Sequence, residues 1–242
     1  MPQPSETFYT IDSTKLGYGE YWRFSNGRWL AFTVCALKKL FGSPMDLHTA
    51  IPRFEQITRL DIAQFSADMM PELAKGLERC RQLNLTFQFY YTIPNIMMQI
   101  SYGAVLLSAD CRTVAQFLVV RSLRGAGKIT LTFNCCSKLK DNRLLATLDQ
   151  PKKMNSPSYS IPEHIPSATP DMVLKRHIER LNKMGGTGAV TLSPDTLEVF
   201  ILELNLRAID AKIAAGVYVP LDPAKAEQMR SERANALNAL KR

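Results

Sequence analysis

Between residues 83 and 150, apolar and polar side chains alternate in five stretches separated by short turns. Residues 85–93 read LTFQFYYTI and place an apolar residue at every second position, and residues 128–136 repeat this alternation. Because successive side chains of a strand point to opposite faces, each stretch predicts a β-strand with one buried face. The side chains expected to share that buried face are Leu85, Phe87, Phe89, Tyr91, Ile93, Ile129, Leu131 and Phe133.

The links between these stretches consist of turn-forming residues. They contain Pro94-Asn95, Ala109-Asp110, residues 124–127 and residues 140–142. Each link is too short to hold a crossover helix, so neighbouring strands are expected to run antiparallel. The five predicted strands of this meander cover about residues 85–93, 96–107, 113–122, 128–136 and 143–149.

Helical patterns flank the predicted sheet. Residues 28–41 are apolar on most sides, which predicts a buried helix that ends at Gly42. Residues 46–66 carry a weaker helical period that Pro52 interrupts. The other predicted helices span about residues 68–81, 171–184, 194–215 and 223–242.

Residues 150–170 contain five prolines. Such a segment is expected to be neither a helix nor a central strand, because proline lacks the backbone donor that both structures require. Tyr159, Ile161 and Ile165 punctuate the segment with apolar anchors. We therefore expect an extended strap over the surface.

Together these elements predict an α+β fold. In it, a five-stranded antiparallel meander sheet over about residues 85–149 is covered on one face by helices, and two further helices follow at the C-terminus. Residues 1–184 would form the α+β domain, including the strap 150–170 and the helix 171–184, and residues 185–242 would form a helical C-terminal extension. Over about residues 5–150, the order of elements resembles that of helix-grip lipid-binding folds in topology alone.

Composition sets the broad class of protein. The chain has 242 residues, of which 46% are hydrophobic and 21% charged, enough to bury a sizeable core. Its net charge of +8 should attract anions such as nucleic acid, an acidic membrane surface or an acidic protein. Residues 1–7 lack the pattern of a signal peptide, and residues 29–41 fall short of the roughly 20 residues of a membrane-spanning helix. A cytoplasmic protein without a transmembrane segment is expected.

Residues that could carry catalysis or bind a metal are few. The three histidines, His48, His164 and His177, form no His-Glu-x-x-His motif, and the five cysteines show no Cys-x-x-Cys spacing. His177 falls on the buried stripe of its helix, which is typical of a packed histidine. Residues 125–128 lack the spacing of a phosphate-binding loop and open a strand, so they predict a hairpin turn. The sequence therefore predicts no catalytic residue, no cofactor and no metal site, and it disfavours an enzyme without excluding one.

The predicted helix 194–215 is apolar on two opposed faces. One face carries Leu197, Phe200, Ile201 and Leu204, and polar residues separate it from the other face. A helix of this kind lies between two layers. One layer would be the protein's own core, and the other would be the last helix, a second subunit or a partner. The partner-binding candidates on the second face are Val199, Leu202, Leu206, Ile209 and Ile213.

Three functions remain open. The leading hypothesis is a non-catalytic binding or assembly protein that engages a protein partner or its own copy through an apolar helix face. The first alternative is a carrier or enzyme with an apolar pocket between sheet and helices, lined by Phe87, Phe89 and Tyr91. The second is a basic module that docks on nucleic acid or an acidic membrane surface. An exposed apolar patch above about 600 Å² would favour assembly, a closed pocket of about 300 Å³ or more would favour a carrier, and a single contiguous basic face would favour the basic module.

Overall fold

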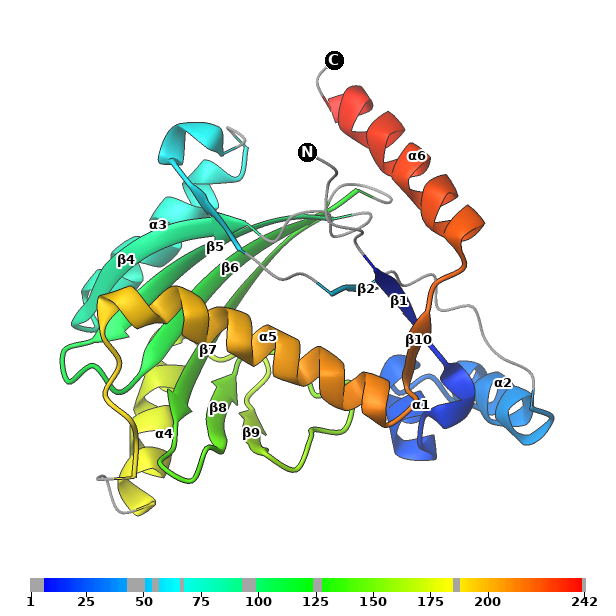
Figure 1. The fold of residues 1–242 in the computed structure, drawn as a ribbon, viewed down its shortest axis with the longest axis horizontal. Helices are drawn as coiled ribbons and strands as arrows, with labels where there is room; N and C mark the ends of the chain where they lie inside the picture. Colours follow the sequence, from blue (N-terminus) through cyan, green and yellow to red (C-terminus); the bar gives the residue numbers. More distant parts are fainter. Residues whose placement is uncertain are drawn as a thin grey trace.

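A seven-stranded sheet forms the centre of the structure (Figure 1). The computed structural model describes residues 7–42, 51–53, 57–65, 68–92, 99–123, 128–184 and 188–240. The strands follow the order β3-β4-β5-β6-β7-β8-β9, and all neighbours are antiparallel except β8 and β9, which are parallel. Their bounds are β3 Thr58–Leu60, β4 Leu85–Thr92, β5 Gln99–Ser108, β6 Val114–Ser122, β7 Ile129–Lys138, β8 Leu144–Leu148 and β9 Ser160–His164.

The α+β class and the antiparallel meander are confirmed, but the predicted strand count of five is wrong. The meander is present as β4 to β8, and one further strand lies at each edge. At one edge, β3 lies in the region where the sequence shows a weak helical period. At the other edge, β9 lies inside the proline-rich strap. An edge strand tolerates Pro162 because one side of an edge strand makes no ladder hydrogen bonds.

Helices cover both faces of the sheet. Figure 1 shows α5 (Leu197–Ala214) in front of the sheet and α3 (Met70–Arg81) and α4 (Pro170–Lys183) behind it. The core beneath α3 and α4 contains Leu73, Phe117, Phe133, Cys135 and Val173. The core beneath α5 contains Val105, Val114, Cys136, Leu197 and Phe200. The expectation that helices cover a single face is therefore wrong, since α5 forms a third layer.

A β-bulge in β4 breaks the predicted alternation. Phe87 and Phe89 pair with adjacent residues of β5, so the residue between them has no partner and the faces reverse. Phe89 and Tyr91 therefore lie beneath α5, whereas Phe133 lies beneath α3 and α4. Phe87 and Leu131 are 40% and 39% exposed. The prediction that these side chains share one buried face is wrong, and Ile93 lies outside the described residues.

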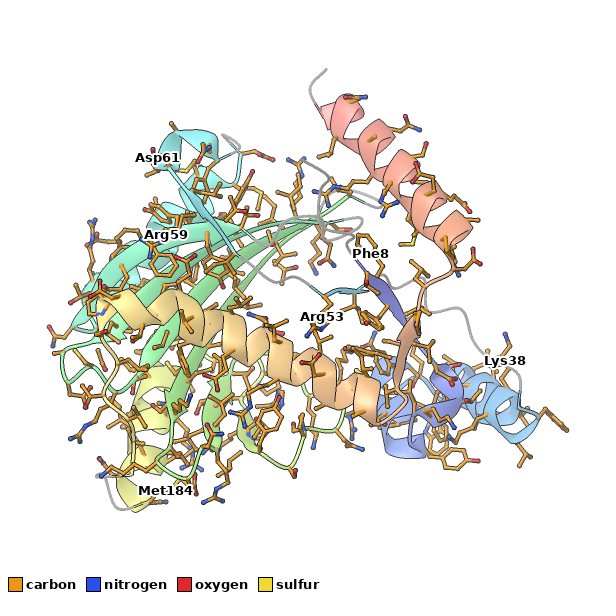
Figure 2. All side chains as sticks on the ribbon, viewed as in Figure 1. Phe8, Lys38, Arg53, Arg59, Asp61 and Met184 are labelled. Atoms are coloured by element: carbon orange, nitrogen blue, oxygen red, sulfur yellow. The ribbon has the colours of Figure 1, made fainter. Side chains whose placement is uncertain are left out.

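A second, smaller sheet joins the two ends of the chain. Its order is β10-β1-β2, with β1 (Phe8–Ile11) between β2 (Ile51–Pro52) and β10 (Tyr218–Pro220). The short helices α1 (Tyr18–Phe24) and α2 (Trp29–Leu40) follow β1, and α6 (Pro223–Leu240) follows β10. Figure 2 shows Phe8 between β1 and α6, where Leu221, Ala226 and Met229 pack with it. The 3-10 helices are Ser13–Lys15, Ile62–Gln64 and Pro194–Thr196.

The predicted division at residue 184 stays a prediction. In the structure, α5 belongs to the predicted C-terminal extension and also supplies Leu197, Phe200 and Ile201 to the core on the sheet. α6 instead packs with Phe8 and Leu221 at the small sheet. The two C-terminal helices thus contribute to different parts of the fold.

The approach of α3 to the sheet depends on a glycine. A Cβ atom added at Gly76 would lie 2.0 Å from Cζ of Phe117, far inside van der Waals contact. We predict that Gly76→Ala lowers the free energy of unfolding by about 1–3 kcal/mol, because overpacking outweighs the better helix propensity of alanine. Urea unfolding followed by circular dichroism measures the change.

Gly19→Ala in α1 is the matched control. The nearest atom to its added Cβ is Nη1 of Arg23 at 3.6 Å, an ordinary contact. Its stability should be unchanged or higher. Equal stabilities of Gly76→Ala and the natural chain would show that α3 does not approach Phe117 this closely.

Candidate functional site

α2 turns its large apolar side chains away from the protein. At 100° per residue they fall within an arc of about 140°, which only Thr33 interrupts. Each of the six is between 49% and 83% exposed. We call this set the α2 apolar stripe: Trp29, Leu30, Val34, Leu37, Leu40 and, directly after the helix, Phe41.

Contacts on the opposite side of α2 fix this orientation. Phe32 and Cys35 pack against the buried cluster that contains Leu16 and Tyr21. The ammonium group of Lys39 donates hydrogen bonds to the backbone carbonyls of Thr14 and Leu16, both at 2.6 Å. The helix is therefore attached through Phe32, Cys35 and Lys39, and the stripe faces outward.

The prediction of a buried helix over residues 28–41 is wrong. None of the residues of α2 is buried. The sequence shows an almost entirely apolar helix, and such a helix is usually covered on every side. Here the protein itself covers only the side with Phe32, Cys35 and Lys39, and the larger part of the apolar surface lies on the other side.

The surroundings of the stripe are positively charged. Residues 21–42 contain Arg23, Arg28, Lys38 and Lys39 and no acidic residue. Figure 2 shows Lys38 on α2, at the end of the molecule that lies away from the large sheet. Arg28 is also exposed, next to the first residue of the helix. A partner that covers the stripe meets cations at its border.

The structure places the five partner-binding candidates of α5 in different environments. Val199 is 67% exposed, whereas Ile209 is buried at 7%. Leu202, Leu206 and Ile213 are half-buried. Their role stays a prediction, but the exposed apolar surface on α5 is much smaller than the α2 apolar stripe.

Two arginines, Arg53 directly after β2 and Arg59 in β3, pair with acidic residues of α5, which the sequence did not indicate. Arg53 pairs with Asp210 at 2.9 Å, and Arg59 pairs with Glu198 at 2.7 Å. The guanidinium group of Arg59 also stacks 4.5 Å from the ring centre of Phe89. These two ion pairs therefore help to hold α5, a role that the sequence suggested for the last helix.

His177 belongs to a buried hydrogen-bond network. Its Nε2 lies 2.9 Å from Oγ of Ser137, and its Nδ1 lies 3.1 Å from Oγ1 of Thr147. Ser137 donates its own hydrogen to the carbonyl of Arg112, and Thr147 accepts a bond from Arg180. Ser137 therefore accepts from Nε2, and Thr147 can donate its hydroxyl hydrogen to Nδ1, so the network satisfies both nitrogens of a neutral imidazole.

The network does not form a catalytic triad. The two ring nitrogens of His177 contact hydroxyl groups instead of a carboxylate, and the side chain has no exposed surface. Nδ1 of His164 lies 2.9 Å from the carbonyl oxygen of Gln150. His48 lies outside the described residues. Among the histidines that the structure describes, neither shows the arrangement of a general base.

The vicinal cysteines point to opposite faces of β7. Cys135 lies beneath α3 and α4, and Cys136 lies beneath α5. Burial raises the pKa of the Cys136 thiol to about 12 and raises that of Cys135 well above its ordinary value. Both are therefore protonated thiols of low reactivity at neutral pH.

A hollow of about 540 Å³ lies between α3, β7 and the strap. Its border includes Lys75, Arg79, Leu131 and Asp149. Its position between sheet and helices agrees with the carrier hypothesis. However, the predicted lining residues Phe87, Phe89 and Tyr91 are not among those that border it.

Within the described ranges, no three histidine, cysteine or acidic side chains lie close enough together to hold a metal ion. Among the described helices, none is both long enough and apolar enough to cross a membrane. No family model, curated protein or solved structure matches the chain.

The buried histidine makes stability depend on pH. Burial, together with the nearby charge of Arg180, lowers the pKa of His177 to about 3, from an ordinary value of 6.5. Above pH 6.5 both folded and unfolded states are neutral at this position. Between pH 6.5 and pH 3, only the unfolded state binds the proton, so stability falls as the pH falls.

We predict that the free energy of unfolding drops by about 2–3 kcal/mol more in the natural chain than in His177→Gln between about pH 7 and pH 4.5. Glutamine retains a donor toward Ser137 but does not titrate. Urea unfolding at the two pH values gives the difference. The same pH dependence in both proteins would show that His177 is accessible to protons in the folded state.

Proposed function

We propose that this protein is a non-catalytic assembly protein, and that it pairs with a second copy of itself through the α2 apolar stripe. The single observation that carries the proposal is the outward orientation of six large apolar side chains on a helix whose other side is firmly attached. The face predicted on α5 is a secondary candidate, since Val199 is its one strongly exposed member.

The size of the stripe suits a protein interface. With about 200 Å² for each of the two aromatic side chains and about 130 Å² for each of the four aliphatic ones, exposed by two thirds on average, the stripe offers roughly 600 Å² of apolar surface. A typical monomer exposes no apolar patch larger than about 300–600 Å². A standard protein interface buries about 800 Å² on each partner. The stripe therefore lies at the upper limit for a monomer and supplies about three quarters of the area of a standard interface.

The spacing of the stripe is self-complementary. Leu30, Val34, Leu37 and Phe41 follow one another at intervals of four, three and four residues, the spacing of a coiled-coil seam. Reversing the direction of the helix exchanges Leu30 with Phe41 and Val34 with Leu37. Two copies of α2 can therefore pack antiparallel around a two-fold axis with seam against seam, which is the symmetry of most dimers.

Charge and position are compatible with this pairing. In an antiparallel pair related by a two-fold axis, each edge of the seam faces the same edge of the other copy, which brings Lys38 of one copy close to Ala31 of the other, so no cations face each other within the seam. α2 also lies at an end of the molecule, away from the large sheet (Figure 1). A second copy can reach the stripe without displacing α5 or α6.

We predict a dimer that Leu37→Glu dissociates. Leu37 is already half exposed in the single chain, so the glutamate costs no folding energy but places a carboxylate in the apolar seam of the dimer. Multi-angle light scattering over about 5–200 µM protein should show a dimer for the natural chain and a monomer for the variant. Circular dichroism should show both to be folded.

Val199→Glu is the matched control, because Val199 is an exposed apolar residue of α5. It should remain dimeric. If Val199→Glu dissociates and Leu37→Glu does not, the assembly face is the one predicted on α5. A natural chain that stays monomeric over the whole concentration range contradicts the proposal.

The sign of the salt effect separates a second copy from an acidic partner. Two chains of net charge +8 repel each other, and salt screens this repulsion. Raising sodium chloride from about 50 mM to about 500 mM should therefore tighten self-association severalfold, as measured by sedimentation equilibrium. Binding to phosphatidylserine vesicles that weakens with salt and disappears in Leu37→Glu would instead assign the stripe to an acidic membrane surface.

A further inference from the structure

One part of β7 lacks a neighbour on one side. β8 pairs with β7 only over residues 134–138 and ends at Leu148. Residues 129–133 pair with β6 on their other side. Among the described strands, none continues the sheet beside them. The hollow of about 540 Å³ lies here, where a longer β8 would have run.

The backbone of Leu131 faces this hollow. The N–H of Phe133 donates to Oδ2 of Asp149 at 2.7 Å, and the N–H of Asp149 donates to the carbonyl of Phe133. The backbone groups of Phe133 therefore point away from β6. In an antiparallel ladder, residues two apart point the same way, so the N–H and C=O of Leu131 also point away from β6. The described sheet has no strand on that side to pair with them.

Asp149 stands at the end of this free edge. Its Oδ1 is buried and has no hydrogen-bond partner. A buried acceptor without a donor is unfavourable, and a bound group that supplies a donor would relieve the cost. Lys75 and Arg79 of α3 lie on the border of the same hollow, and Phe117 and Leu131 provide apolar surface.

We propose that the hollow binds the free N-terminal segment of a peptide, which adds three to four residues as a short strand to the edge of β7. Binding by strand addition uses the backbone groups of an exposed sheet edge, here those of Leu131. Because Phe133 is already paired with Asp149, the free edge consists of residues 129–132. It spans about 13 Å, which sets the length of the bound segment.

The direction of the added strand follows from Asp149. A segment that continues the course of β8 runs antiparallel to β7 and begins beside Asp149, so its α-ammonium group lies next to the Asp149 carboxylate. The reverse direction would bring a C-terminal carboxylate to Asp149, and two like charges would meet in a half-buried place. The ends of the hollow therefore distinguish the two directions.

The probe is a pentapeptide of alternating valine and glutamate with a fluorescent label at its C-terminus. Glutamate is chosen because Lys75 and Arg79 border the hollow. Fluorescence polarisation should show binding to the full chain, and acetylation of the α-amine should weaken it about tenfold or more. No binding of either peptide at protein concentrations up to about 1 mM overturns the proposal.

Two variants of one residue test the strand addition. Leu131→Pro removes the N–H that faces the hollow but none that faces β6, so the sheet tolerates it. It should abolish peptide binding, whereas Leu131→Ala, which keeps the N–H, should stay within about threefold of the natural chain. Unchanged binding by a folded Leu131→Pro variant overturns strand addition.

Asp149→Asn tests the capture of the amine without altering the edge. Its side-chain oxygen can still accept the N–H of Phe133. The Asp149→Asn substitution should reduce the difference in affinity between the free and the acetylated peptide to about threefold or less. An acetylated peptide that binds the natural chain as tightly as the free one overturns the assignment of Asp149. The Leu37→Glu variant should bind the peptide normally, so this test does not depend on the proposed assembly.

Discussion

The hydrogen bonds of His177 and Arg180 hold α4 to three strands at once. His177 reaches Ser137 of β7 and Thr147 of β8, and Arg180 donates to Thr147 and to the carbonyl of Ile161 in β9. These contacts place the strap beside β8, and the strap forms one wall of the hollow at the free part of β7. The network is structural in itself, but the candidate peptide site depends on it.

The sequence was sufficient for those parts of the fold that rest on local periodicity. The meander strands and the helices over residues 70–81, 170–183 and 197–214 appear close to where their patterns predict them. The bulge after Phe87 could not be predicted from the sequence, because one extra residue exchanges the two faces of the strand without changing its composition. β9 was missed for a related reason. Prolines exclude a central strand but not an edge strand, and only the fold decides which position a segment takes.

The candidate sites were harder to predict because they depend on exposure and not on residue type. The apolar character of residues 28–41 was evident, but the side that the protein itself covers is set by Lys39 and by contacts with Tyr21. On α5, the two apolar faces were evident from the helical periodicity of the sequence, whereas the ion pairs with Arg53 and Arg59 were not. The free edge of β7 arises from the difference in length between two strands, which no motif encodes.

The pairing of β1 with β10 has a consequence for biosynthesis. The base on which α2 rests contains Ile11, Leu16 and Tyr21 from the start of the chain and Val217 from near its end. During translation, α2 emerges early, but this base is complete only after residue 217 has left the ribosome. A nascent or truncated chain therefore lacks part of the support that orients the stripe. Long-range closure of this kind delays the complete support of α2 until residues 217–220 have been made, about 180 residues after α2 itself.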